Sequence, residues 1–344
     1  MLTIVEVAER ARVSIATVSN VIRGTKRVSP ALQARVNKAI RELDYHPNEI
    51  ARSLKVKQTR MLGMVLPDIT NPFFPEMMRG AEDRAFERGY FLLTANTDEQ
   101  IARERKIVSA LRSYRVDGIL LAAAPGKELS HIRSTMQAGI PVVFLDRTVA
   151  GIKADAVVLH NVHGGFECVR HLVSIGHTRI GIITGSLDVL TGRERLRGYE
   201  KALREAGIEI DQDLILEGNF REESGYNLGK NLLRMKPRPS AIFVCNGLMT
   251  VGALKAFEEL GIRCPEDVAI ATFDDLVADR SFHPHLTVVA QPGYEMGARA
   301  ATILMDRIEG KLTKDPSVVR ITPTLVIRES TKLGRPLAMT NGTR

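Results

Sequence analysis

The stretch Thr3–Arg23, with the sequence TIVEVAERARVSIATVSNVIR, decides the fold of the N-terminal region. Two short apolar stripes with helical spacing lie on either side of a tight turn of about three residues. They consist of Ile4, Val7, Ala8 and Ala11, and then of Val18, Val21 and Ile22. Ser14 is a favourable N-cap for the second helix. The pattern predicts a helix-turn-helix, in which the second helix enters the major groove of DNA.

Positive charge is concentrated in the same region. Residues 1–60 contain 12 Lys and Arg against 5 Asp and Glu, whereas the whole chain contains 48 against 40. The remaining 284 residues are therefore almost neutral, with 36 basic and 35 acidic side chains. Such a distribution favours binding to DNA phosphates with release of counterions. The alternative is a pair of core helices in an all-helical subdomain, which the narrow stripes and the charge both disfavour.

Two further segments follow the helix-turn-helix. Ser29 and Pro30 predict the start of a third helix that completes a small core. Its apolar stripe consists of Leu32, Val36, Ala39, Ile40 and Leu43. Residues 47–60 form a short polar segment, which is typical of a solvated linker or of a hinge helix that is marginal by itself and orders on DNA.

From Met61 onward, short apolar runs alternate with amphipathic stretches. The expected buried strands are LGMVLP, YFLLTAN, GILLA, VVFLD, RIGIITG, AIFVCN, VAIATFDD and TVVAQP. The expected helices span about residues 75–88, 102–115, 129–138, 165–174, 194–206, 224–233, 249–260 and 294–308, and a pair of strands is expected around 321–327. This alternation indicates parallel sheets that are covered on both faces. The expected fold class is therefore α/β, with two doubly wound lobes and a cleft between them.

The expected domains follow from these changes of pattern. Residues 1–46 form the helix-turn-helix headpiece, and residues 47–60 form the hinge helix and linker. The N-terminal lobe comprises residues 61–161 and 292–322, and the C-terminal lobe comprises residues 162–291 and 323–330. The polar tail, residues 331–344, has few apolar anchors, and we expect it to be disordered.

Composition and motifs disfavour several classes of protein. No run of about 18 apolar residues and no signal-peptide pattern occurs, so we expect a cytoplasmic chain that does not enter a membrane. P-loop, G-x-S-x-G and H-E-x-x-H motifs are absent, and we expect no cofactor, no metal and no enzyme activity. We expect the three cysteines to be reduced and mostly buried, and four histidines to be solvated or capping residues rather than metal ligands. These are Cys168, Cys245 and Cys264, and His160, His163, His171 and His177.

Polar and aromatic side chains gather where the predicted strands end. The first strand is followed by the run from Pro67 to Phe74, which places an amide beside two aromatic rings. Later strand ends carry Asp146-Arg147, Asn246, Asp274-Asp275 and Gln291, and one helix is expected to open with Arg193-Glu194-Arg195. Aromatic faces surrounded by Asp, Asn, Gln and Arg suit a neutral polyhydroxy ligand such as a sugar. A cap, a turn or a surface ion pair is the alternative for each of these residues alone.

The chain resembles the LacI/GalR family of bacterial transcription regulators from Thr3 to about Ser330. The matching stretches are VSIATVSNVIRG, PNEIARSLK, DITNPFF, RERLRGYEKAL, NFREESGY and the run from VAIATFDD to AQP. The resemblance implies a core like that of periplasmic sugar-binding proteins and a homodimer on a near-palindromic operator. It also favours the hinge helix, with Leu54 as an apolar wedge in the minor groove. The chain carries no heptad extension of leucines at its C-terminus, so we expect a dimer rather than a tetramer.

Residues for both binding functions can be assigned on this basis. Those expected to face DNA are Ile15, Ala16, Thr17, Asn20, Arg23, Lys26, Arg52, Leu54 and Lys55. Those that match family positions facing the effector are Asn71, Phe73, Phe74, Asp146, Arg147, Arg195, Phe220, Asn246, Asp274 and Gln291. The effector set looks closest to that of pentose binders such as ribose-binding proteins.

Three positions depart from the family pattern. His160 and Gly247 stand where Asp is frequent, and Asn20 stands where Arg or His is frequent. The exact effector and the operator sequence therefore stay open.

We expect a sequence-specific DNA-binding transcriptional repressor of carbohydrate-metabolism genes. It would bind a palindromic operator as a homodimer, controlled by a pentose or another monosaccharide in the cleft, with release of DNA by an inducer as the favoured mode. Within the same class, the alternative is a corepressor-type regulator that responds to a purine or a phosphorylated metabolite. Outside it, a solute-binding protein or an enzyme could use the same lobes. The headpiece disfavours both, and the missing motifs further disfavour an enzyme.

Overall fold

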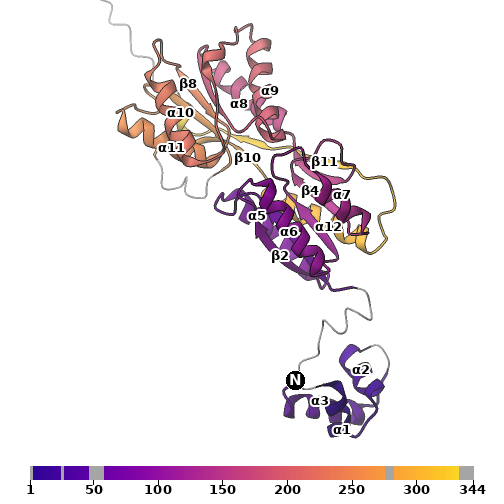
Figure 1. Cartoon of the computed structure of the whole chain (residues 1–344). Coiled ribbons are helices and arrows are strands. Elements are labelled where there is room, and N and C mark those ends of the chain that lie inside the picture. Colours follow the sequence, from indigo (N-terminus) through magenta and orange to yellow (C-terminus); the bar gives the residue numbers. More distant parts are fainter. Residues whose placement is uncertain (1–2, 25–26, 46–57, 276–282, 333–344) are drawn as a thin grey trace, which may run out of the picture. The chain divides into compact units, whose positions relative to one another are not determined.

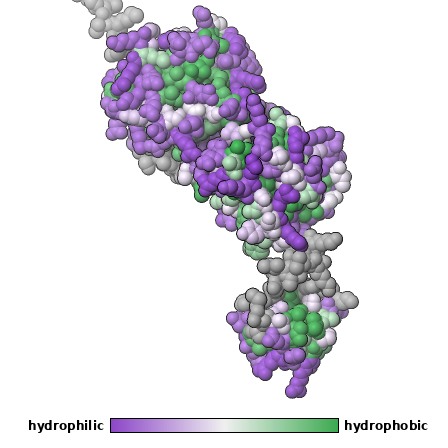
Figure 2. All heavy atoms as spheres, viewed as in Figure 1, coloured by the Kyte–Doolittle hydropathy of each residue, from purple (hydrophilic) through white to green (hydrophobic). Residues whose placement is uncertain are grey.

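The computed structural model describes residues 3–24, 27–45, 58–275 and 283–332. The chain divides into two compact units, Met1–Thr59 and Arg60–Arg344. The second unit consists of two lobes, each built on its own sheet (Figure 1). Hydrophilic side chains cover most of the face of this unit that Figure 2 shows. None of the described helices is long and apolar enough to cross a membrane.

The first unit contains the three helices that the sequence predicts. They are α1 (Ile4–Ala11), α2 (Ile15–Arg23) and α3 (Pro30–Glu42). The backbone N–H of Thr3 donates to Glu6 Oε2 at 2.6 Å, and Ser14 Oγ accepts from the N–H of Thr17 at 3.1 Å, so that both caps use free helix N–H groups. Ser29 is the N-cap residue of α3, but its side chain makes no capping bond with the described residues. The shared core consists of Val7, Ala8, Ala11, Val18, Val36, Ala39 and Tyr45.

The N-terminal lobe of the second unit is built on six parallel strands in the order β11-β5-β4-β3-β1-β2. These are β1 (Met61–Leu66), β2 (Phe91–Asn96), β3 (Gly118–Leu121), β4 (Val142–Asp146), β5 (Asp155–Leu159) and β11 (Val318–Ile321). Its helices are α5 (Phe73–Glu87), α6 (Ile101–Ser113), α7 (Ser130–Gln137) and α12 (Gly293–Ile308). Leu62, Met64 and Leu66 face a core with α5 and α12. Val65 belongs to a second core with α6 and α7, so helices cover both faces of the sheet.

The C-terminal lobe repeats this plan with the strand order β12-β10-β9-β8-β6-β7. Its strands are β6 (Ile180–Thr184), β7 (Ile215–Glu217), β8 (Ala241–Val244), β9 (Ala269–Phe273), β10 (Thr287–Ala290) and β12 (Thr324–Val326). Only the pair of β12 with β10 is antiparallel among the described strands. The helices are α8 (Asn161–Ser174), α9 (Leu190–Glu205), α10 (Glu222–Arg234) and α11 (Gly247–Glu259). The α/β fold class with two doubly wound lobes is therefore confirmed.

Several boundaries differ from the sequence prediction. Strands β5 and β7 were not predicted, because β5 runs into α8 without a turn residue and β7 has only three residues. The two strands expected around residues 321–327 do not pair with each other, since β11 and β12 join different sheets. Helices α8 and α9 each begin four residues earlier than predicted, at Asn161 and Leu190. Both helices have glycines in their first turns. Because glycine has a low helix propensity, the sequence pattern did not predict a helix over these residues.

Helices α5 and α12 pack closely against each other at two glycines. A Cβ atom added to Gly297 of α12 would lie 1.8 Å from the carbonyl oxygen of Met77, and one added to Gly80 of α5 would lie 2.0 Å from that of Tyr294. Any larger side chain at these two positions would separate α5 from α12. The chain crosses from β10 of the C-terminal lobe to α12. The close contact with α5 packs α12 against the N-terminal lobe.

Candidate functional site

The outer face of α2 carries the first group of predicted DNA-binding residues. Ile15 is 47% exposed and Ala16 is also exposed, although Ile15 is a large apolar residue in the first turn of the helix. Val18 is fully buried, so the two faces of α2 are clearly separated. Thr17 and Asn20 are half-buried. An exposed apolar residue beside a small one can contact thymine methyl groups in a major groove.

The other residues predicted to face DNA are only partly described. Arg23 is the last residue of α2, and its side chain is not described. Lys26, Arg52, Leu54 and Lys55 lie outside the described residues, as does most of the predicted hinge helix.

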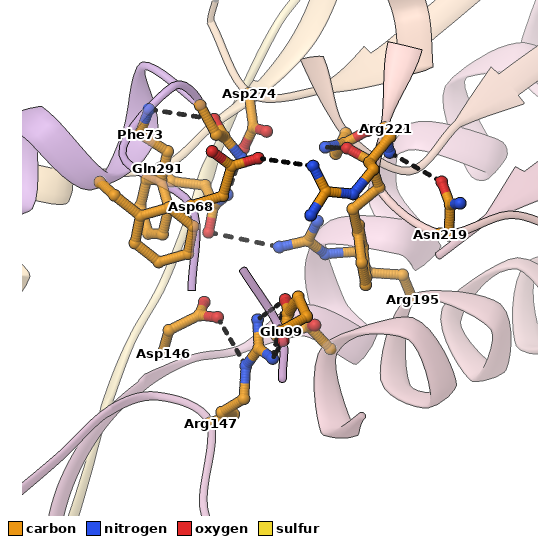
Figure 3. Close-up of a pocket in the computed structure, with 15 residues that line it drawn as sticks. Asp68, Phe73, Glu99, Asp146, Arg147, Arg195, Asn219, Arg221, Asp274 and Gln291 are labelled. Carbon is orange, nitrogen blue, oxygen red and sulfur yellow. Dashed lines mark hydrogen bonds and ion pairs between the residues drawn. The ribbon is translucent and has the colours of Figure 1, made fainter. Parts of the chain in front are cut away.

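All ten residues predicted to face an effector line one cavity between the two lobes (Figure 3). They come from both sheets and lie mostly at or just beyond the carboxyl ends of strands, where open α/β sheets bind ligands. Asp146 ends β4, Asn246 follows β8, Asp274 follows β9, and Gln291 follows β10. The cavity also includes Asp68, Glu99, Thr191, Asn219 and Arg221, which were not assigned from the sequence.

Arg147 forms the charged centre of the N-terminal side of the cavity. It is 5% exposed, and its Nη1 and Nη2 donate to both carboxylate oxygens of Glu99 at 2.9 to 3.2 Å. Its Nε donates to Asp146 Oδ2 at 3.3 Å, and Nη1 also donates to the carbonyl oxygen of Ala123. Burial alone would lower the pKa of Arg147, but the charges of Glu99 and Asp146 outweigh it and raise the pKa.

Asp146 keeps one carboxylate oxygen without a partner. Asp146 is 3% exposed, so water has little access to this oxygen. The oxygen, Oδ1, also accepts no hydrogen bond from any described residue. A buried acceptor without a donor is costly, and such a group at a ligand cavity is available to a donor on the ligand.

Arg195 forms the corresponding centre on the C-terminal side. Its Nε donates to Asn161 Oδ1 at 2.9 Å, and its Nη1 donates to the carbonyl oxygen of Cys245 at 2.5 Å. The guanidinium lies 3.9 Å from the ring centroid of Phe273, which holds its plane in place. Nη2 reaches Gln291 Oε1 at 3.5 Å, so this guanidinium faces the cavity as part of a fixed network.

Asp274 and Gln291 complete that network. Gln291 donates from Nε2 to Asp274 Oδ1, and the other oxygen of Asp274 accepts from the N–H of Gly247 at 3.0 Å. Asn246 is the N-cap of α11, because its Oδ1 accepts from the N–H of Met249 at 2.9 Å. Its Nδ2 donates to the carbonyl oxygen of Phe220. The polar groups are thus oriented by helix caps rather than by flexible contacts.

Three aromatic rings supply the apolar surface. Phe73 and Phe74 open α5 and are nearly buried, with their ring centroids 5.2 Å apart. Asn71 precedes them and accepts the N–H of Phe73 at its Oδ1. On the opposite side, the ring of Phe220 occupies the space above Gly185, where an added Cβ would lie 1.9 Å from Cζ.

Four residues of the cavity have left-handed backbone conformations. Their φ angles are +59° for Glu99, +64° for Asp146, +65° for Phe220 and +74° for Asp274. This conformation costs a residue other than glycine about 1 to 2 kcal/mol. Strained residues of this kind cluster at sites where the side-chain direction matters for function.

One ion pair joins the two lobes at this cavity. Arg221 of the C-terminal lobe places Nη1 3.9 Å from Asp68 Oδ2 of the N-terminal lobe, and both side chains are partly exposed. Asp68, Glu99 and Asn219 lie beyond the ends of β1, β2 and β7, so the strand-end rule could have identified them. Asn219 was harder to place than the other two because β7 has only three residues and was not predicted.

The cysteines and the described histidines form no metal-binding cluster. No group of three metal-binding side chains occurs among the residues that the structure describes. Cys168 and Cys245 are buried and Cys264 is half-buried, and burial raises the pKa of each thiol. Our interpretation of His171 and His177 as solvated or capping residues was wrong. His171 bonds Thr331 Oγ1 at 2.8 Å, and the buried His177 bonds Ser240 Oγ at 2.9 Å.

Comparisons with known proteins agree with both parts of this geometry. Residues 3–48 match the family model "Bacterial regulatory proteins, lacI family", and residues 169–331 match the model "Periplasmic binding protein-like domain". The chain is 37% identical over 332 residues to the HTH-type transcriptional repressor PurR of Pasteurella multocida, covering 96% of this chain and 99% of that protein.

Solved structures give the same result. A putative ribose operon repressor from Burkholderia thailandensis is 35% identical, with a TM-score of 0.72 over 78% of this chain and 98% of that chain. The Lac repressor dimer bound to operator and the anti-inducer ONPF is 26% identical, with a TM-score of 0.86 over 97% of this chain and 99% of that chain. These relatives are repressors and not enzymes. The chain belongs to the LacI family and is a DNA-binding transcriptional repressor.

Proposed function

We propose that this repressor is controlled by a neutral pentose, with D-ribose as the first candidate, bound between the lobes in contact with the ten residues predicted from the sequence. The observation that carries the proposal is the unpaired Oδ1 of Asp146, buried at the cavity beside the guanidinium of Arg147. A sugar hydroxyl donates and accepts at once, so one hydroxyl can donate to Asp146 and accept from Arg147.

The charge of the cavity supports a neutral ligand. Its lining contains four carboxylates, from Asp68, Glu99, Asp146 and Asp274, and three guanidinium groups, from Arg147, Arg195 and Arg221. The formal charge is therefore −1, and the two buried arginines already have protein partners. A phosphorylated or acidic ligand would bring a further negative charge without a cation reserved for it.

The aromatic rings support a sugar as well. Phe73 and Phe74 lie on one side of the cavity and Phe220 lies on the other, so apolar C–H groups of a ring between the lobes can be covered from both sides. The related protein from Burkholderia thailandensis, a putative ribose operon repressor, agrees with this ligand class. We propose that the regulated genes serve carbohydrate metabolism.

A purine corepressor is the second candidate, because the curated relatives carry the name PurR. The facing phenylalanine rings could stack on a flat base. The carboxylates of Asp146 and Asp274 can accept only from N–H groups of a base, whereas a pentose offers hydroxyls around its whole ring.

A titration of the full-length protein distinguishes the two candidates. D-ribose, D-ribose 5-phosphate, hypoxanthine and guanine are titrated by calorimetry, and each is then added to an operator-binding assay. We expect saturable binding of D-ribose and weaker operator binding in its presence. Binding of a purine alone, together with tighter operator binding, would replace the pentose proposal with the corepressor one.

For the DNA-binding function, we propose a homodimer that places α2 of each copy in the major groove of a palindromic operator half-site. The related Lac repressor structure is described as a dimer bound to operator. Ile15 and Ala16 would contact base edges, Asn20 would read a base, and Leu54 would enter the minor groove. Asn20→Arg is expected to change the preferred operator, measured by selection from randomised half-sites. An unchanged preference would remove Asn20 from the base-reading set.

A further inference from the structure

We propose that Glu99 is an internal ligand of the cavity, which a sugar must displace from Arg147 and whose charge selects against acidic ligands. This inference rests on the proposed pentose function and assigns a specificity-determining residue to the same site. Glu99 comes from the connection between β2 and α6 and shares the cavity lining with the ten predicted residues (Figure 3).

The cavity is too small for a sugar in the arrangement that the structure shows. Its volume is about 30 Å³, whereas sites for small molecules typically measure about 300 to 1,000 Å³. A pentose therefore cannot enter the cavity as the structure shows it. The Glu99 carboxylate fills space directly in front of Arg147 and uses both of its oxygens on that guanidinium.

The hydrogen-bonding capacity of Arg147 leads to the same conclusion. Arg147 donates to Glu99, to Asp146 and to the carbonyl oxygen of Ala123, so its donors are largely taken. Asp146, by contrast, keeps one oxygen unpaired. A hydroxyl that donates to Asp146 and accepts from Arg147 therefore competes with Glu99 for this guanidinium.

Glu99 lies nearer to solvent than Arg147 does. Its side chain is 23% exposed, compared with 6% for Arg147, so water can solvate a carboxylate that is released from Arg147. Asp98 and Glu99 both have left-handed backbone conformations, with φ of +53° and +59°. The connection is thus held in a costly conformation by side-chain bonds, and the loss of those bonds favours its rearrangement.

Selection against acids follows from the same geometry. An anionic ligand could replace Glu99 on Arg147, but the displaced carboxylate would stay attached to the same loop and would repel it. Asp68, Asp146 and Asp274 add to this repulsion. A neutral hydroxyl carries no such cost, so Glu99 makes the site choose a sugar over the corresponding sugar acid.

The first experiment compares the wild-type protein with Glu99→Gln and with Glu128→Gln as a matched control. Glu128 lies in the same lobe, is about half exposed and is outside the cavity. D-ribose and D-ribonate are titrated into each full-length protein by calorimetry. We expect Glu99→Gln to bind D-ribose about tenfold more tightly, because a neutral amide holds Arg147 less strongly than a carboxylate does. We also expect the preference for D-ribose over D-ribonate to fall by at least about tenfold, and Glu128→Gln to behave like wild type.

Weaker or unchanged ribose binding by Glu99→Gln, with the preference against D-ribonate intact, would overturn the proposal. It would show that Glu99 contacts the bound sugar or has only a structural role.

A second experiment does not depend on the identity of the effector. Glu99→Ala removes the internal carboxylate, and added formate can take its place on Arg147. We expect formate to raise the thermal midpoint of Glu99→Ala by about 2 °C or more, and not to stabilise wild type or Glu128→Ala. Equal effects on all three proteins would refute occupancy of the site by Glu99. If wild type binds no pentose but formate rescues Glu99→Ala specifically, the pentose proposal fails while the internal ligand stands.

Discussion

Asp146 is the residue on which we expect ligand affinity to depend most directly. Asp146→Asn keeps the size of the side chain but replaces one acceptor oxygen with an amide that cannot accept a hydroxyl. We expect the affinity for D-ribose to fall by about 10- to 100-fold, as for the loss of one charge-assisted hydrogen bond. Calorimetry on the full-length variant measures this effect. Asp211→Asn, which removes an exposed carboxylate paired with Arg179, serves as control, and equal losses in both variants would contradict the assignment.

Gly185 shows how a residue without a side chain can define a binding surface. In Gly185→Ala the new Cβ would overlap the ring of Phe220, so the ring has to leave its present position. We expect at least a tenfold loss of ligand affinity, with a destabilisation of about 1 to 3 kcal/mol. In Gly181→Ala, within the preceding strand β6, the new Cβ meets only the flexible end of Leu232 at 3.0 Å, and the variant should retain binding. Retained affinity in Gly185→Ala would mean that Phe220 does not contact the ligand.

Secondary structure could be predicted from the sequence wherever one physical signal dominated. The apolar periodicity of α1, α2 and α3 and the continuous apolar runs of the central strands were sufficient. Strand β7 is short and lies at a sheet edge, so it lacks a continuous buried run. The starts of α8 and α9 were hidden by glycines whose role is close packing: an added Cβ at Gly165 would lie 2.6 Å from the carbonyl oxygen of Arg195.

The residues of the candidate site also differ in how well the sequence predicts them. Side chains at the ends of long buried strands, such as Asp146 and Asp274, could be found from the sequence alone. The family resemblance supplied Phe220 and selected Arg195 from a predicted helix start. The strand-end rule places Glu99 near the cavity, but its position in the lining also depends on a left-handed backbone and on a long-range pair with Arg147. Local sequence patterns carry little information about either feature.

Helix α8 and the turn after it contain two histidines that should make the C-terminal lobe sensitive to acid. Burial lowers the pKa of His171 and His177 in the folded protein. Both imidazoles therefore bind fewer protons in the folded protein than in the unfolded one. Their contribution to the free energy of unfolding is fully present above the unfolded pKa of about 6.5, and it is lost as the pH falls below that value. We expect the thermal midpoint to fall between about pH 7 and about pH 5. In His177→Gln this decrease should be smaller, whereas the exposed His163→Gln should behave like wild type. An identical pH dependence in all three proteins would contradict the prediction.

Charge is divided between the two units according to what each is proposed to bind. The basic excess lies in residues 1–60, whereas the cavity of the second unit has a formal charge of −1. Operator binding should therefore weaken steeply with salt, by roughly 10³- to 10⁵-fold between about 50 and about 200 mM. Binding of a neutral sugar releases no counterions, and we expect its affinity to change by less than about threefold over the same range. A steep salt dependence of effector binding would indicate an anionic ligand instead.

Control of DNA binding by the effector imposes a reciprocal relation on the whole molecule. If D-ribose lowers operator affinity by a given factor, operator DNA must lower D-ribose affinity by the same factor, because both describe one coupling free energy. We expect a factor of about 5 to 150. Arg221→Ala removes the ion pair with Asp68 that joins the lobes, so it should reduce this factor more than it changes operator affinity without effector. Titrations of D-ribose with and without operator, matched by operator titrations with and without D-ribose, measure both sides of the relation. An unchanged factor in Arg221→Ala would show that this pair takes no part in coupling the cavity to the headpiece.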